Sequence, residues 1–201
     1  MTLLRTDRMD GLRTASPLAT EPRWYACYTR AKHEKQVIAR LESSGIESYL
    51  PTVPSTRVWK DRSKTLLWPL FPSYVFGRFT LGDVHRVLTV PGVSTIVRAN
   101  GLPAPIPDGE IDNVRAFATA VAAAQVEPEL QPLVDAGSWV RVRGGAFKDV
   151  VGQAIERRGK KRMLVGLHAV GQGMEVDIDT RLLRVIPPPA WATAARPPAP
   201  R

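Results

Sequence analysis

The segment Gln125–Ala136 divides this chain into two parts whose hydrophobic residues follow different patterns. It contains Pro128 and Pro132, and proline fixes the backbone and lacks the amide hydrogen that helices and sheets use. Strand-like runs alternate with helix-like runs before this segment, whereas the periodic runs after it are strand-like. The pattern predicts two separately folding bodies, with residues 125–136 as the linker between them.

The first predicted body, residues 22–124, mixes strands with helices. Its expected elements are strands at 24–29, 46–50, 73–79 and 94–98, and helices at 31–44, 82–90 and 108–124. The last helix repeats apolar residues along one face, at Ile111, Val114, Ala118 and Val121. A long basic excursion, Pro51–Pro69, separates two of the strands. This order predicts an antiparallel sheet with helices packed on it.

The second predicted body, residues 137–186, carries strand signals alone. Its expected strands are 138–143, 150–156, 162–168, 174–178 and 182–186. Short strands in so little chain predict a small closed barrel, because closure removes exposed strand edges. The predicted fold class is therefore α+β: an N-terminal antiparallel sheet flanked by helices, joined by a linker to a small all-β barrel.

The ends and the charge of the chain bear on its surroundings. Residues 1–21 show no periodicity and residues 187–201 are rich in proline and alanine, so we predict that both are disordered tails. Lys and Arg number 28 against 19 acids, a net charge of +9 that favours a polyanionic neighbour such as nucleic acid or an acidic protein surface. The single cysteine, Cys27, fits a reducing compartment. Without a signal-like leader or a membrane-length apolar run, we expect a cytoplasmic protein with no membrane contact.

The sequence offers no group of residues that suits catalysis. His33, His85 and His168 are scattered, and there is no second cysteine at metal-ligand spacing. Gly171-Gln172-Gly173 is only a fragment of a dinucleotide-binding fingerprint and lies within a predicted hairpin. Cys27 lies in an apolar strand, where we expect a small buried hydrophobic residue. We therefore predict no catalytic residue, no metal and no cofactor.

Two segments resemble the NusG family of transcription factors. The first combines Trp24–Thr29 (WYACYT), the basic helix Lys32–Leu41 and Leu70–Phe76 (LFPSYVF), and it is similar to the N-terminal domain of NusG proteins. The second, Gly137–Phe147 followed by Gly152, resembles a KOW motif, although alanine replaces the proline of the family's Gly-Pro-Phe loop. The resemblance implies a polymerase-binding domain at residues 22–124 and an SH3-like KOW barrel at residues 137–186.

The resemblance also implies a function. Proteins of this family bind RNA polymerase at the β′ clamp helices, brace the β side of the cleft and promote processive elongation and antitermination. The stretch Arg57–Arg62 is similar to specialised paralogues that serve particular long operons. Two alternatives stay open: a housekeeping factor that couples to Rho or to a small-subunit ribosomal protein, and a ribosome- or RNA-associated KOW protein without polymerase contact. We expect a monomer that is not an enzyme.

An aromatic patch is the expected polymerase-binding site. On the strand 73–79, Tyr74 and Phe76 share a face. A buried tyrosine hydroxyl needs a partner, which favours a half-exposed platform over a strand buried on both sides, the alternative reading. The resemblance adds Tyr28 from the first strand, and Phe71 and Pro72 beside it, to the same patch. Exposed aromatic residues of this kind are typical binding hot spots.

Two further sites are expected from the pattern and the resemblance. On the first helix and just before it, a polar stripe faces either solvent or the non-template DNA strand; its residues are Arg30, Lys32, His33, Gln36 and Arg40. In the barrel, Phe147 lies on a glycine-rich loop and either plugs the end of the barrel or contacts Rho or a ribosomal protein. The basic excursion with Trp59 and Lys60 is either a binding hairpin or a solvated one.

Overall fold

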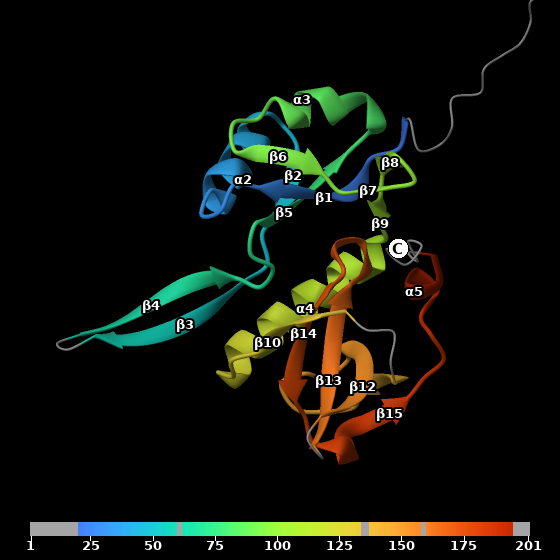
Figure 1. Cartoon of the computed structure of the whole chain (residues 1–201). Helices are drawn as coiled ribbons and strands as arrows, with labels where there is room; N and C mark the ends of the chain where they lie inside the picture. The colour runs from blue at the N-terminus through green and yellow to red at the C-terminus, as the bar shows by residue number, and fades with distance from the viewer. Residues whose placement is uncertain (1–19, 60–61, 134–136, 158–159, 195–201) are drawn as a thin grey trace, which may run out of the picture.

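The computed structural model describes residues 20–59, 62–133, 137–157 and 160–194, and its N-terminal body is built on an antiparallel sheet. The strands run in the order β2-β5-β1-β6, with β9 also pairing with β1 (Figure 1). Their bounds are β1 (Arg23–Thr29), β2 (Glu47–Tyr49), β5 (Tyr74–Phe79), β6 (Val93–Ile96) and β9 (Pro105–Ile106). The predicted antiparallel sheet is confirmed.

Helices cover both faces of this sheet. One face packs against α2 (Glu34–Ser43) and α3 (Val84–Leu88), which follows the short 3-10 helix η1 (Leu81–Asp83). The opposite face packs against α4 (Asp108–Ala124). The alternation along β1 explains this division, because Tyr25 and Cys27 lie in the first core and Trp24 and Ala26 in the second.

The predicted excursion between strands is a two-stranded hairpin. It consists of β3 (Thr52–Trp59) and β4 (Arg62–Pro69), which pair along their whole length and project from the body of the protein (Figure 1). A second, much shorter hairpin is formed by β7 (Arg98–Ala99) and β8 (Leu102–Pro103). Side chains at the far end of the long hairpin, including those of Trp59 and Lys60, lie outside the described residues.

The C-terminal body is all-β apart from short 3-10 turns, as predicted. Its strands are β10 (Glu129–Pro132), β11 (Ser138–Val142), β12 (Val151–Arg157), β13 (Lys160–Leu167), β14 (Gln172–Asp177) and β15 (Leu183–Val185). They pair in the order β10-β14-β13-β12-β11-β15, with the 3-10 helices η2 (His168–Val170) and η3 (Thr180–Leu182) after β13 and before β15. Inward-facing residues such as Val140, Met163 and Val176 fill the interior.

An ionic cluster joins the strand β10 to this barrel. Arg162 bonds Glu175 at 2.9 Å and Glu129 at 3.1 Å, and it also pairs with Asp177. The Glu175 side chain is fully buried, so its charge depends on Arg162 for compensation. These contacts raise the pKa of Arg162 further above its usual range, chiefly through the hydrogen bond to Asp177.

Three local expectations differ from the structure. Part of the predicted linker is the edge strand β10, whose end tolerates Pro132 because an edge strand has an unpaired side. Part of the predicted C-terminal tail is the helix α5 (Ala190–Ala194), because Trp191 supplies a large apolar ring that composition alone conceals. The first helix begins at Glu34 and not near Ala31, since Lys32 takes a left-handed φ of 65°. Residues 1–19, 134–136 and 195–201 lie outside the described residues.

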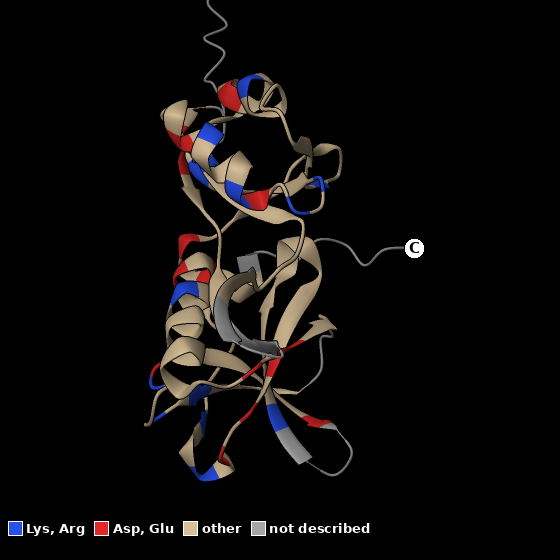
Figure 2. Cartoon of the chain, turned by 90° about the vertical axis from the view of Figure 1, so that its left-hand side faces the viewer, with Lys and Arg blue, Asp and Glu red and all other residues tan. Residues whose placement is uncertain are grey.

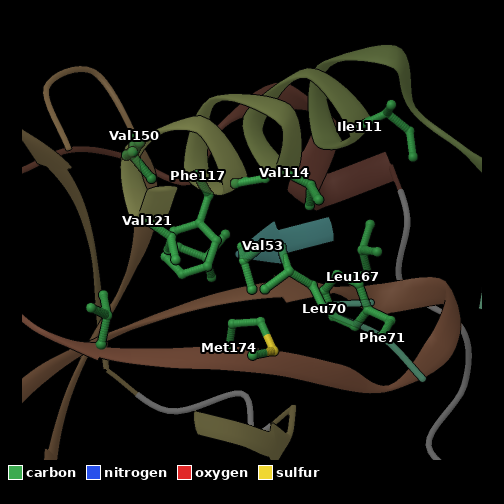
Figure 3. Packing of buried hydrophobic residues seen from close by; sticks show 14 of the residues in the cluster. Val53, Leu70, Phe71, Ile111, Val114, Phe117, Val121, Val150, Leu167 and Met174 are labelled. Carbon is green, nitrogen blue, oxygen red and sulfur yellow. The ribbon is translucent and has the colours of Figure 1, made fainter. Parts of the chain in front are cut away.

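The two bodies share one continuous hydrophobic core, with α4 between the sheet and the barrel. One cluster of buried residues contains Phe76 from the sheet, Phe117 from α4 and Val140 from the barrel. Figure 3 shows Leu70 and Phe71 close to Leu167 of the barrel, on the side of α4 that carries Ile111 and Val114 in the same view. The helix α4 is therefore packed on two sides, and the linker joins bodies that are in contact.

We predict that the thiol of Cys27 is unreactive in the folded protein. The side chain is fully buried in β1, and burial raises the pKa of the thiol to about 12. At pH 8 only roughly one thiol in ten thousand would be the reactive thiolate. Alkylation should therefore be slower than for a free thiol by at least about a thousandfold until the N-terminal body unfolds. Mass spectrometry after a pulse of iodoacetamide measures this, and fast labelling without denaturant would contradict it.

Candidate functional site

An exposed pair of tyrosines marks one end of the N-terminal sheet. Tyr28 and Tyr74 are cross-strand partners on β1 and β5, and their ring centroids lie 5.3 Å apart at an interplanar angle of 64°. Tyr28 is 43% exposed and Tyr74 is half-buried. Desolvation raises the pKa of the Tyr74 hydroxyl, so the ring is neutral at physiological pH. The pair offers apolar surface with a polar rim, which suits a protein contact.

The loop before β5 is held in place by α2. Ser73 adopts a left-handed φ of 64°, its N–H donates to Glu34 Oε1 at 2.9 Å, and its carbonyl accepts from Thr29 N–H at 2.8 Å. The buried carboxylate of Glu34 thus fixes the loop that carries Pro72, which is exposed beside the tyrosine pair. Glu34 could not be predicted from the sequence, because an acid in the first turn of a helix is an ordinary feature.

Two of the five expected patch residues are buried. Phe71 is 1% exposed and Phe76 is 0% exposed, and their rings meet edge to face at 6.3 Å. Phe76 pairs with Ala26 on the face of the sheet whose core includes α4, and Figure 3 shows Phe71 close to Leu167 of the barrel. The continuous exposed face expected for Tyr74 and Phe76 is therefore absent here: Tyr28, Pro72 and Tyr74 face solvent, and both phenylalanines face the core.

Only part of the expected basic stripe is exposed to solvent. Arg30, Lys32 and Gln36 are exposed, and Arg30 lies two residues after Tyr28. His33 is half-buried and lies against Gly92, and Arg40 donates a hydrogen bond to the carbonyl of Pro91. In the view of Figure 2, basic and acidic residues are interspersed over the helices of this body.

In the barrel, the glycine-rich loop faces α4. Phe147 is 8% exposed, and its ring centroid lies 5.8 Å from that of Phe117 on α4. Of the two expectations for Phe147, plugging a hydrophobic space describes this structure, with α4 supplying one wall of that space. The surface expected to contact a further partner is covered.

A stripe of α4 residues spaced i, i+3 and i+7 meets the barrel: Glu110, Asn113 and Phe117. Glu110 is 0% exposed, and its Oε1 accepts the backbone N–H of His168 at 2.7 Å and lies 2.8 Å from Nδ1 of the same residue. Asn113 forms two hydrogen bonds with the backbone of Val151, accepting at 2.9 Å and donating at 2.7 Å. Polar groups on α4 thus satisfy backbone groups of the barrel.

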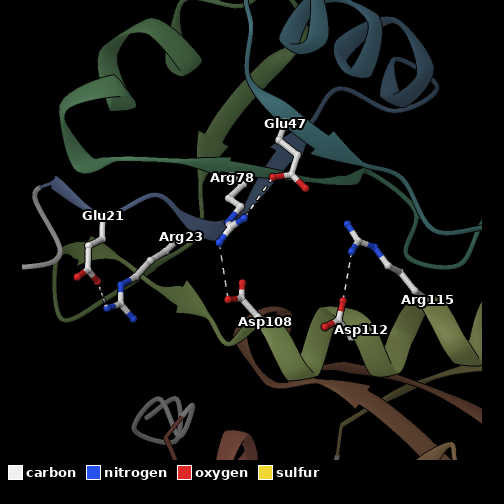
Figure 4. A network of polar contacts seen from close by, with 7 residues as sticks. All are labelled: Glu21, Arg23, Glu47, Arg78, Asp108, Asp112 and Arg115. Atoms are coloured by element: carbon white, nitrogen blue, oxygen red, sulfur yellow. Dashed lines mark hydrogen bonds and ion pairs between the residues drawn. The ribbon is translucent and has the colours of Figure 1, made fainter.

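The other side of α4 is tied to the sheet. The Arg115 guanidinium lies 5.2 Å from the Trp24 ring centroid and 4.9 Å from that of Tyr49, distances suited to cation–π contacts. Desolvation raises the pKa of Tyr49 to about 12, an effect that nearby Arg115 partly opposes. Figure 4 shows Arg115 paired with Asp112 at 3.2 Å, and Arg78 of β5 reaching Asp108 at 3.8 Å.

The described part of the chain contains no group of three or more His, Cys, Asp or Glu residues placed to hold a metal ion. Within the same residues, no helix is long and apolar enough to cross a membrane. The features that stand out are the exposed tyrosine pair and the large contact between the bodies, both of which are means of binding proteins.

The fold is an α/β body joined to an all-β barrel. Residues 22–115 match the family described as "Transcription termination factor nusG". The transcription termination/antitermination protein NusG of Staphylococcus carnosus is 27% identical over 175 residues, covering 78% of this chain and 93% of the relative. NusG of Rickettsia prowazekii is 23% identical over 169 residues, covering 78% and 86%. A solved structure titled "Domain interaction in Thermotoga maritima NusG" shares 23% identity, covers 84% of this chain and 99% of that chain, and gives a TM-score of 0.45.

Residues 22–115 thus match the NusG family, and over most of its length the chain is similar to NusG transcription termination/antitermination proteins.

Proposed function

We propose that this protein binds RNA polymerase through the surface around Tyr28, Pro72 and Tyr74 and promotes processive, antiterminated transcription. The exposed tyrosine pair is the observation that carries the proposal. Half-exposed aromatic residues on a rigid sheet are typical hot spots, because they bury much area at little cost in side-chain entropy. From the family resemblance, the partner surface that we propose is the β′ clamp helices.

The contact between the bodies adds a regulatory element to this proposal. Phe71, expected to touch polymerase, and Phe147, expected to touch a partner of the barrel, both lie in the shared core. We propose that this arrangement is a closed form, in which each body covers part of the surface with which the other would bind its partner. A partner that binds only an open form shifts the population toward it by its differential affinity.

Closure favours an operon-specific role over a housekeeping one. A factor stored in a closed form acts where an additional interaction opens it, whereas a general factor needs Phe147 accessible for Rho or a ribosomal protein. Arg30 lies two residues after the exposed Tyr28, and we propose that Arg30, Lys32 and Gln36 contact the non-template DNA strand. An RNA-associated KOW protein without polymerase contact is the weaker alternative, because the exposed tyrosine pair lies outside the barrel.

We predict that Tyr28→Ala and Tyr74→Ala each weaken binding to core RNA polymerase. Loss of a hot-spot ring should cost ~2 kcal/mol or more, equal to roughly a thirtyfold drop in affinity. Both rings are partly solvated, so the thermal midpoint should change little. Biolayer interferometry with immobilised polymerase measures the affinity.

Leu102→Ala is the matched control, because Leu102 is an exposed apolar residue on the separate hairpin β7–β8. It should bind like the unaltered protein. Full polymerase affinity in a well-folded Tyr28→Ala/Tyr74→Ala double variant would refute the proposed docking surface.

A further inference from the structure

The chain beyond the barrel returns to the first turn of α4. After β15, the N–H of Ile186 donates to the carbonyl of Trp139 at 2.9 Å, and Pro187–Pro189 then lead to α5. Consecutive prolines are stiff, so they hold α5 at a set distance from the barrel with little loss of entropy on docking. In Figure 1, α5 lies beside the start of α4.

The indole ring of Trp191 lies directly against Gly109 of α4. A Cβ atom added at Gly109 would come within 2.7 Å of Trp191 Cδ1, closer than such contacts occur. Gly109 has an ordinary helical backbone, so the helix itself does not require glycine there. Its missing side chain is what allows the ring to lie against the helix.

Two rings from the barrel complete this contact. The centroid of Trp191 lies 5.5 Å from that of Trp139 and 6.5 Å from that of His168, and Trp139 stacks on His168 at 6.1 Å. His168 is the residue whose N–H and ring contact the buried carboxylate of Glu110. Trp191 therefore touches both bodies and lies over the polar contact that joins them. Excluding water from such a contact strengthens it.

We propose that residues 187–194 form a strap that holds the two bodies closed, with Trp191 as its anchor. Docked, the strap seals the Glu110–His168 contact and keeps Phe71 and Phe147 covered. Undocked, it leaves that contact open to water, and the bodies separate more often. The consequence for access to RNA polymerase rests on the proposed function, whereas the effect on closure does not.

Amide hydrogen exchange on the full chain, followed by NMR without polymerase, tests the strap. The N–H groups of His168 and Val151 both donate to side chains of α4, so their protection reports closure. The N–H groups of Val75 in β5 and Val165 in β13 report each body alone. Trp191→Ala should reduce protection at His168 and Val151 about tenfold or more, with Val75 and Val165 unchanged.

Two further variants sharpen the result. Gly109→Ala should have the same effect as Trp191→Ala, although alanine ordinarily favours a helix over glycine, and truncation after Ile186 should match both. Thr193→Ala is the control, because Thr193 is an exposed residue of α5 that bonds only within that helix. Unchanged protection at Val151 in all three variants, loss confined to His168, or equal loss at Val75 and Val165 would each overturn the strap. None of these outcomes depends on whether the protein binds polymerase.

Discussion

Replacing Phe76 by alanine should lower the free energy of unfolding by ~3–5 kcal/mol, because it removes a ring from the centre of the shared core. Phe76 is 0% exposed and packs edge to face on Phe71 beneath α4. The cavity would lie where the sheet, α4 and the barrel meet, so relaxation from any one side could fill it only in part. Urea unfolding followed by circular dichroism measures the loss.

Tyr74→Ala is the matched control, since Tyr74 lies two residues earlier on the same strand and the same face. It is half-buried at the rim, so its truncation should cost only about 1 kcal/mol of stability. The two truncations would then have different effects: Phe76→Ala would lower stability, whereas Tyr74→Ala would weaken polymerase binding. Equal stability losses in both variants would show that the face is not divided as the structure indicates.

The alternation of residues predicted much of the N-terminal body. Tyr25 and Cys27 point to one core and Trp24 and Ala26 to the other, as a period of two requires. The same period did not decide whether Phe76 was exposed, because both faces of the strand carry apolar residues. What decides it is α4, a helix that begins more than thirty residues later in the chain.

The contact between the bodies could not be predicted from the spacing of residues. The predicted apolar stripe of α4 accounts for one buried side of the helix. The second side includes Glu110 and Asn113. In the sequence, nothing distinguishes these polar residues from those of a solvent-exposed helix face. Their partners, His168 and Val151, are distant in the chain and are bonded through backbone groups that carry no sequence signal.

At the end of the chain, one large ring also orders a segment whose composition predicts disorder. Residues 187–201 have the proline and alanine content of a disordered segment, yet Trp191 orders part of it against α4. Composition averages over a window, and so it does not reveal the contact between one indole ring and the glycine opposite it.

The double variant Glu110→Ala/Asn113→Ala should open the two bodies. It removes the hydrogen bonds of Glu110 and Asn113 to the barrel and leaves the N–H groups of His168 and Val151 without these partners. Unsatisfied buried groups cost about 1–3 kcal/mol each, so a combined loss of ~3 kcal/mol is expected, equal to roughly a hundredfold increase in the opening equilibrium. Asp112→Ala is the control on the same helix, because Asp112 is exposed and pairs with Arg115 of α4 itself.

Spin labels at Ser94→Cys and Glu156→Cys measure that opening. Both positions are exposed and lie in different bodies, and the buried thiol of Cys27 should stay unlabelled. We expect one narrow distance distribution for the unaltered protein and for Asp112→Ala, and a broad, longer one for the double variant.

The same double variant should bind core polymerase more tightly, by up to the factor by which the open population rises, because apparent affinity scales with the fraction of molecules that are competent to bind. A broad distribution without tighter binding would mean that closure does not limit access to polymerase. An unchanged distribution would mean that the apolar part of the interface, centred on Phe117 and Phe147, holds the bodies together without these hydrogen bonds.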